Sequence, residues 1–184
     1  MEEQIERVLA FWVDEIGPAG WYAQDDAVDA RIARDFGDVY EQAAARQLGN
    51  WMITPRGSLA LIILLDQFSR NLFRGSGQAF AADRYCLSLA KGAVRRNHDL
   101  AIAEPQRRFF YMPLMHSETL ADQEHCLRLF LLRLPETGPE TLIHSVTHRE
   151  VIRRFGRFPS RNAALGRTDS DAELAYRAEG GYMS

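Results

Sequence analysis

The chain has 184 residues, of which 46% are hydrophobic and 26% are charged, a composition typical of a globular protein that buries a substantial core. Its 22 basic and 25 acidic residues give a net charge of -3, which excludes the basic excess that proteins use to bind the phosphate backbone of nucleic acids. We therefore expect a single domain over residues 1–184, with no nucleic-acid partner.

Signals for a membrane or for an oxidising compartment are not found in the sequence. The N-terminal MEEQIERVLAFW is acidic and amphipathic, unlike a secretory signal, and the longest apolar stretch, residues 59–65, is too short to cross a bilayer. Cys86 and Cys126 form neither a disulfide framework nor a Cys-x-x-Cys metal pair. We expect a cytoplasmic protein with no membrane partner and with both thiols buried.

Apolar residues recur at helical spacing along the whole chain, and no segment alternates apolar and polar residues as a strand would. The predicted helices span residues 2–15, 26–47, 58–73, 78–96, 104–111, 117–133, 139–155 and 171–179. Glycine and proline residues separate them, and Ser170 followed by Glu173 predicts a capping box for the last one. The short connections predict an all-α fold of antiparallel helix pairs, with about eight helices.

Residues 59–73 are predicted to form the central helix, because the segment LALIILLDQFSRNLF is apolar on nearly every side before Asp66. Asp66 and Arg70 lie four residues apart on a face that carries apolar core positions. A buried charge must be paired, so we predict an ion pair between them. Such a pair either ties neighbouring helices together or belongs to a functional site.

A second concentration of polar residues lies between Tyr111 and Leu134. Leucines form the predicted packing face of this helix, namely Leu120, Leu127, Leu131 and Leu134. His116 and Gln123 fall on the same face, where a histidine is more often a hydrogen-bonded core residue than a metal ligand. The predicted solvated face carries Glu118, Asp122 and His125, whose spacing is not that of a His-Glu-x-x-His site. We therefore expect no metal and no cofactor.

The third concentration begins at His148, which aligns with the apolar residues of its helix and is followed by a group of arginines. These arginines are Arg153, Arg154, Arg157, Arg161 and Arg167. Guanidinium groups suit bidentate recognition of carboxylates and phosphates. The competing interpretation is surface charge beside the C-terminus of a helix, where the macrodipole favours cations.

A weak internal repeat links two of these regions. QFSRNLFRG near residue 70 and RFPSRNAALGR near residue 160 each place Ser-Arg-Asn after a phenylalanine, with a glycine and a further arginine downstream. The chain has no Gly-x-Ser-x-Gly elbow and no Walker or dinucleotide glycine signature. Common nucleotide-binding and serine-hydrolase motifs are thus excluded.

With these segments together, the chain resembles the bacterial family called domain of unknown function 924. The resemblance covers nearly the whole chain and rests on VLAFW, LLDQFSRNLFRG, AFAAD, FFYMPLMHSE, LADQE and HREVIRRFGRFPSRNAALGR, in this order. It implies a tetratricopeptide-like arrangement of antiparallel helices and does not imply an enzyme. The residues that match the family pattern are Asp66, Gln67, Arg70, Asn71, His116, Glu118, Asp122, Gln123, Arg157, Arg161 and Asn162.

The chain departs from the family pattern at Ser69, where we expect proline, and at Ser160, where we expect histidine. If the family uses a histidine at position 160 for chemistry or metal binding, this chain lacks it.

Two functions follow as hypotheses. The first is a binding module whose polar, arginine-containing groove recognises a peptide or a small anionic ligand. Its candidate binding residues are Asp66, Gln67, Arg70, Asn71, His116, Gln123, His148, Arg157, Arg161 and Asn162. The second is an enzyme, for example a hydrolase, with His116 or His148 as general base and Asp66 or Glu118 as orienting carboxylate. A purely structural interaction protein is a further alternative, and the oligomeric state cannot be read from the sequence.

Under either function we predict that DQFSRN, MHSE and RFPSRN meet in one polar site, because buried polar groups need partners. The enzyme requires its histidine and carboxylate to converge in one solvent-reachable cavity. The position of Arg161 tests the shared site most directly. An Arg161 guanidinium that lies in solvent, far from Asp66 and His116, would contradict the prediction that the three segments meet.

Overall fold

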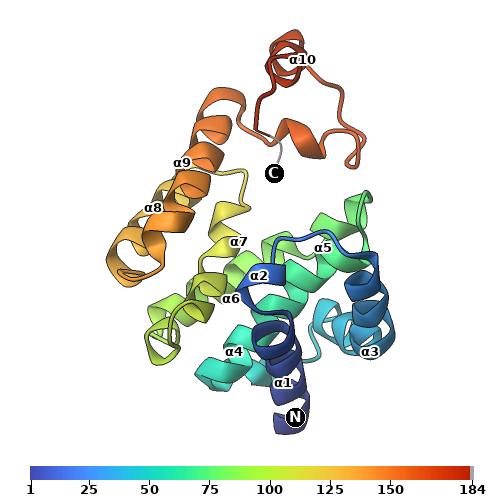
Figure 1. Cartoon of the computed structure of the whole chain (residues 1–184), viewed down its shortest axis with the longest axis vertical. Coiled ribbons are helices and arrows are strands. Elements are labelled where there is room, and N and C mark those ends of the chain that lie inside the picture. The colour runs from blue at the N-terminus through green and yellow to red at the C-terminus, as the bar shows by residue number, and fades with distance from the viewer. Residues whose placement is uncertain (183–184) are drawn as a thin grey trace.

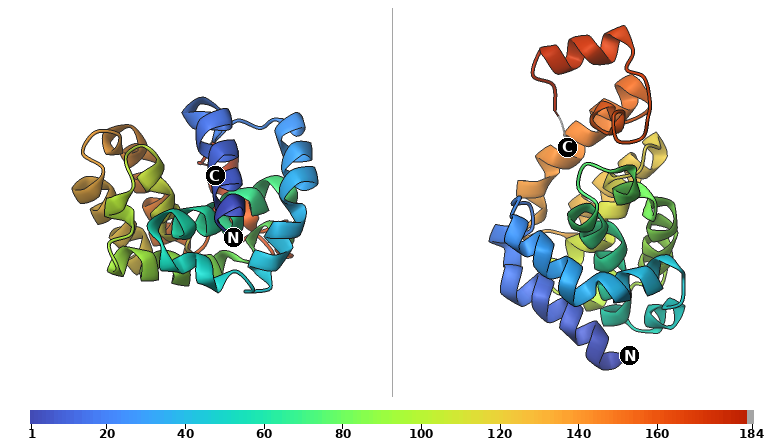
Figure 2. Two further views of the ribbon diagram at one scale, coloured as in Figure 1. Left: turned by 90° about the horizontal axis from the view of Figure 1, so that it is seen from below. Right: turned by 90° about the vertical axis from the view of Figure 1, so that its right-hand side faces the viewer.

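The computed structural model describes residues 1–182, apart from the side chain of Glu140, and that part of the chain is helical with no strand. The predicted all-α class is confirmed. The N-terminus lies at one end of the long axis and helix α10 lies toward the other (Figure 1). The right-hand view of Figure 2 shows α9, in orange, leading from the main body of the molecule toward α10, in red. Within the described residues, no helix combines the length and the hydropathy needed to cross a membrane.

The first half of the chain packs around one long helical run. Its elements are α1 (Glu2–Leu9), a π-helical segment (Ala10–Ile16), α2 (Gly17–Gly20), α3 (Asp26–Ala44), a 3-10 helix (Gly49–Ile53), α4 (Pro55–Ile62), a second π-helical segment (Ile63–Phe68) and α5 (Ser69–Leu72). The Thr54 hydroxyl accepts a hydrogen bond from the Gly57 amide, and Pro55 occupies the first turn of α4. Both features favour a helix start.

The second half forms the helices that cover this run and then extend away from it. Its elements are a 3-10 helix (Gly77–Phe80), α6 (Asp83–Arg95), two further 3-10 helices (Asp99–Ala101 and Gln106–Phe110), α7 (Met112–Met115), α8 (Leu120–Arg133), α9 (Gly138–Phe155), a 3-10 helix (Pro159–Arg161) and α10 (Asp171–Ala178). The predicted helix over 104–111 is replaced by the 3-10 helix Gln106–Phe110. Pro113 favours the first turn of a new helix, so α7 begins there. The capping box of Ser170 and Glu173 is confirmed.

The prediction of a central helix is also confirmed. Every residue from Leu59 to Leu65 is at most 2% exposed, and Phe68 packs against three aromatic rings of the surrounding helices, Phe11, Trp12 and Phe36. A smaller apolar cluster of Val151, Ile152 and Phe158, with Phe155 and Tyr176 packed against it, joins α9 to α10. The tetratricopeptide-like arrangement stays a prediction.

Asp66 and Gln67 lie in the π-helical segment of the central run. The wider turn changes the backbone hydrogen bonding, and side chains supply bonds to the Asp66 carbonyl: Ser69 Oγ donates to it at 3.1 Å and Arg70 Nη1 at 2.6 Å. Single π-helical turns are frequent at functional sites. This segment therefore both positions Asp66 and marks the region as a candidate site.

The packing face predicted for α8 was wrong in part: Gln123 and Leu134 are buried as predicted, but two of the leucines are exposed. Leu120 and Leu131 are 36% and 58% exposed, whereas Asp122, Gln123, Cys126, Leu129 and Phe130 are buried. The buried face of α8 is determined by packing against α7 and α9, which the positions of the leucines in the sequence do not reveal. Asp122 is tolerated in a buried position because it pairs with Lys91 and accepts a hydrogen bond from Ser117 Oγ at 2.9 Å.

Candidate functional site

A cleft of about 750 Å³ opens between the N-terminal helices, the central run, α7 and α9. One wall is apolar and aromatic and includes Trp21, Tyr22, Met112 and Met115. The polar lining is basic or uncharged and consists of Gln67, Arg70, Asn71, Arg74, Arg108, His116, Thr137, Thr141, His144, His148 and Tyr182. Among these described lining residues there is no carboxylate, although three are arginines and three are histidines.

Asp66 lies directly behind this lining and is 1% exposed. Its carboxylate accepts hydrogen bonds from His116 Nδ1 at 2.8 Å and from Gln67 Nε2 at 2.5 Å, and it lies 3.4 Å from Arg70 Nη1. Burial alone would raise the pKa of Asp66, but the charge of Arg70 and the contacts with His116 and Gln67 outweigh it and hold the pKa well below its usual range. The predicted Asp66–Arg70 pair is confirmed, with His116 as an additional partner.

The contact with Asp66 fixes the tautomer of His116. An ionised carboxylate can only accept, so Nδ1 carries the proton and Nε2 is left as an acceptor. Burial lowers the pKa of His116, and the nearby Arg70 lowers it further, so the ring is neutral at pH 7. His116 Nε2 forms no hydrogen bond with any residue that the structure describes, and the ring lines the cleft.

His148 has the same arrangement on α9. It is 3% exposed, its Nδ1 donates to the His144 carbonyl at 2.7 Å, and its ring centroid lies 6.4 Å from that of His116. Burial lowers the pKa of His148 to about 4. Two neutral imidazoles, from the end of α7 and from α9, thus line one cleft, each with its Nδ1 proton bonded to the protein and its Nε2 left as an acceptor.

The depressed pKa of His148 predicts a pH dependence of stability. Between the ordinary histidine pKa of 6.5 and a folded-state pKa of about 4, the unfolded chain binds more protons than the folded one, so stability falls as the pH is lowered. At pH 4 this effect of His148 lowers the free energy of unfolding by about 3 kcal/mol relative to pH 7. Urea unfolding of the wild type and of His148→Phe from pH 7 to pH 4 measures it. The advantage of the wild type should shrink across this range, and a constant difference would contradict the assignment.

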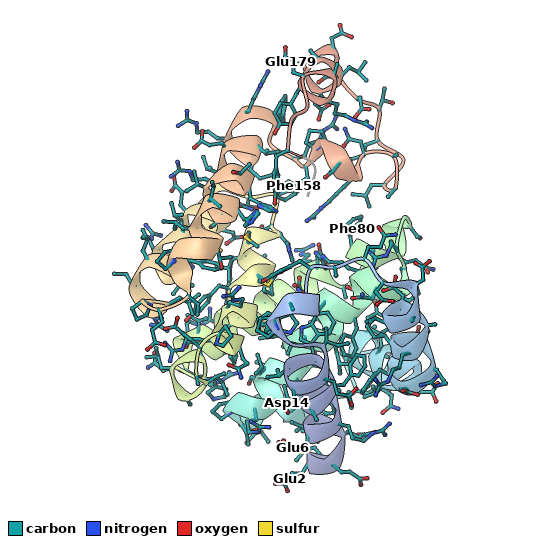
Figure 3. The ribbon with its side chains drawn as sticks, viewed as in Figure 1. Glu2, Glu6, Asp14, Phe80, Phe158 and Glu179 are labelled. Carbon is teal, nitrogen blue, oxygen red and sulfur yellow. The ribbon has the colours of Figure 1, made fainter. Side chains whose placement is uncertain are left out.

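Arg161 and Arg70, the arginines of the two Ser-Arg-Asn segments, converge on one carboxylate. Arg70 Nη2 and Arg161 Nη1 lie 3.1 and 3.4 Å from the same Oδ2 of Asp83. Both guanidinium groups also stack on Phe80, at 5.7 and 4.7 Å from its centroid, and Arg161 stacks on Phe158 at 4.5 Å. Figure 3 labels Phe80 and Phe158 on the two parts of the molecule that Arg161 joins.

The asparagines of the two Ser-Arg-Asn segments are also bound to carboxylates. Asn71 Nδ2 donates to Asp29 at 2.7 Å, and Asn162 Nδ2 donates to Asp169 at 2.6 Å. Each of these aspartates also pairs with an arginine, Arg74 for Asp29 and Arg177 for Asp169. The repeat seen in the sequence therefore corresponds to two similar polar clusters that meet at Asp83.

Five of the residues predicted for the site line the cleft, namely Gln67, Arg70, Asn71, His116 and His148. The others lie outside the lining. Asp66 is behind it, Gln123 donates to the carbonyls of Met115 and Ser117, Arg157 pairs with Glu173, Arg161 is buried against Asp83, and Asn162 is bonded to Asp169. Glu118 pairs with Arg167 and orients neither histidine.

The three polar segments meet as predicted, two of them in direct contact and the third through the carboxylate of Asp83. DQFSRN and MHSE are joined directly by the Asp66–His116 hydrogen bond. RFPSRN joins them through Arg161, which is 7% exposed and shares Asp83 with Arg70. Arg161 is therefore a buried connection between segments and does not line the cleft.

Sequence reasoning missed Arg108, a lining residue from the 3-10 helix before α7. It is 7% exposed, its Nε donates to the Pro105 carbonyl at 3.2 Å, and its Nη1 lies 3.5 Å from the Tyr22 hydroxyl. The guanidinium stacks 5.7 Å from the centroid of Trp21. No described side chain offers it a carboxylate. The available signal was its place directly before the apolar run FFYM.

The fold and the cleft define an all-helical protein with a basic pocket beside a buried Asp–His pair. The chain belongs to a family of bacterial proteins of unknown function, DUF924, whose sequence profile matches residues 8–181. A solved structure with the same fold, a protein of unknown function from Agrobacterium tumefaciens, is 38% identical, with a TM-score of 0.91 over 97% of this chain and 99% of that chain. No curated protein matches the sequence.

Proposed function

We propose that the cleft binds a small anionic ligand. The observation that carries this proposal is Arg108, a guanidinium that is only 7% exposed and has no carboxylate partner among the described side chains. A buried charge is strongly disfavoured unless it is paired, and an anion in the cleft would pair with it. The planar guanidinium suits carboxylate and phosphate oxygens in particular.

The remainder of the cleft supports a small organic molecule rather than a bare ion. Its volume of about 750 Å³ is that of a typical small-molecule site, and Trp21, Met112 and Met115 form an apolar wall. The Tyr22 hydroxyl and the Thr137 and Thr141 side chains line the same cleft as polar groups. Such a combination fixes the orientation of a ligand through a few polar contacts.

Calorimetric titration with inorganic phosphate tests the proposal. Arg108→Gln should bind phosphate at least about tenfold more weakly than the wild type, because a hydrogen bond to a charged group contributes about 1.5 to 3 kcal/mol. Arg128→Gln is the matched control, since Arg128 is an exposed arginine on α8 that does not line the cleft. Equal affinity in the wild type and both variants, or no binding by the wild type, would refute the proposal.

A second candidate function is hydrolysis, which the Asp66–His116 hydrogen bond favours. A buried carboxylate that holds Nδ1 and leaves Nε2 open is the arrangement of a general base. It would take a proton from water as the water oxygen bonds to an ester carbonyl carbon, and the acyl C–O bond would then break to release the acid and, from a nitrophenyl ester, 4-nitrophenolate. With an activated ester that carries a carboxylate, 4-nitrophenyl hydrogen succinate, His116→Gln should lose about 10² to 10⁴-fold in kcat. Turnover that is absent, or unchanged by this substitution, would leave binding as the only proposed function.

A further inference from the structure

Three hydrogen-bond acceptors that receive no donor from the described residues belong to side chains that line the cleft on the central run, α7 and α9. Two are the Nε2 atoms of His116 and His148, whose protons are held on Nδ1 by Asp66 and by the His144 carbonyl. The third is Gln67 Oε1, since the Nε2 atom of that amide donates to Asp66. All three residues line the cleft, and none of these three atoms is bonded to a described residue.

The charges around these acceptors include one carboxylate, Asp66, which contacts both His116 and Gln67 and lies one layer behind two of the three acceptors. The nearest guanidinium groups, Arg70 and Arg161, are balanced by the carboxylates of Asp66 and Asp83. No carboxylate of the described side chains balances Arg108. Among the described residues, the two ends of the cleft therefore differ, with a guanidinium that lacks a carboxylate partner at one and acceptors that lack donors at the other.

We propose that the acceptor end receives a primary ammonium group, so that the ligand is a small zwitterion. An ammonium group has three N–H donors and no acceptor, which matches three acceptors that lack donors. Its anionic group would pair with Arg108, and this part of the inference rests on the proposed function. Nearly complete burial makes the match specific, because Gln67 and His148 are 6% and 3% exposed and a ligand that left them unsatisfied would lose affinity.

One small molecule can reach both ends. The sulfur of Met112 contacts Gln67 Nε2 at 3.8 Å and the Tyr22 hydroxyl at 3.9 Å, and that hydroxyl lies 3.5 Å from Arg108 Nη1. Two side chains, Met112 and Tyr22, thus lie between Gln67 at the acceptor end and Arg108 at the arginine end. A ligand that lies across Met112 would place its two charged groups on opposite sides of the sulfur.

The test compares two probes with the same phosphate group, O-phosphoethanolamine and ethyl phosphate, by calorimetry at pH 7.5. The first ends in an ammonium group and the second in a methyl group. The wild type should bind phosphoethanolamine at least about tenfold more tightly, which corresponds to one hydrogen bond to a charged group. Gln67→Met and His148→Phe should each reduce this ratio, whereas Gln47→Met, an exposed position outside the cleft, should preserve it.

The outcomes separate the two proposals. Equal binding of both probes by the wild type overturns the ammonium site and leaves the anion site standing. Binding of neither probe overturns both proposals. In Arg108→Gln, both affinities should fall. Thermal unfolding of each variant establishes that it is folded. If His148→Phe does not fold, the affinity ratio of Gln67→Met, which preserves side-chain length, tests the ammonium site alone.

Discussion

Replacing Asp66 with alanine should lower the free energy of unfolding by about 3 to 5 kcal/mol, because the substitution removes one of the two carboxylates that pair with Arg70 and the acceptor of both His116 and Gln67. Asp66 is 1% exposed and contacts Arg70, His116 and Gln67 at once, so three polar side chains lose a partner. Urea titration of the wild type and of Asp66→Ala measures the effect directly from the transition midpoints and slopes.

The control for this experiment is Glu6→Ala. Glu6 pairs with Arg56, but both side chains are about half exposed, at 47% and 56%. Exposed ion pairs contribute at most about 1 kcal/mol, so this variant should remain close to the wild type. A loss of only a few tenths of a kcal/mol in Asp66→Ala would show that the pair is solvated and would contradict the buried arrangement.

The second large effect is expected for Arg161→Ala, which should lose about 3 kcal/mol of stability. The Arg161 side chain is 8% exposed, lies between Phe80 and Phe158 and pairs with Asp83. Burial lowers the pKa of Arg161 to about 10, so the side chain stays charged at pH 7. Its replacement by alanine therefore removes both the ion pair with Asp83 and the stacking on the two phenylalanines. Arg161→Lys keeps a cation but not the planar stack, and should recover only part of the loss.

Arg153→Ala is the matched control, because Arg153 is 67% exposed and pairs only at the surface with Glu150. Binding provides an independent readout. Arg161 does not line the cleft, so folded Arg161→Ala should retain phosphate affinity, whereas Arg108→Gln should lose it. Loss of phosphate binding in Arg161→Ala without any loss of stability would place Arg161 in the ligand site and contradict this assignment.

The features that the sequence could predict are those that depend on local pattern. An apolar run with an acid and an arginine four residues apart identified the central helix and its ion pair, because burying such residues leaves few other arrangements. The Ser170–Glu173 spacing identified a helix start. The π-helical segments could not be predicted, because they arise from tertiary packing and no residue type in Ile63–Phe68 requires them.

The site was predictable only in part for a related reason. Helical periodicity placed His116 and Asp66 on apolar faces, but it cannot show that Asp66 lies behind the cleft while His116 lines it. Arg161 was predicted to belong to the site, but the sequence cannot show that Phe80, distant along the chain, and the neighbouring Phe158 bury it against Asp83. Arg108 lies in a short 3-10 helix whose sequence has no clear apolar periodicity. Its burial depends on contacts with Trp21 and Tyr22 from the N-terminal part of the chain.

The central claim, that the cleft binds an anion at Arg108, is tested most directly by diffraction from crystals soaked in selenate, a tetrahedral anion whose selenium scatters anomalously. The strongest anomalous peak should lie in the cleft within hydrogen-bonding distance of the Arg108 guanidinium, and it should disappear in Arg108→Gln. Selenate bound only at exposed arginines such as Arg128 and Arg153, with none in the cleft, would contradict the claim.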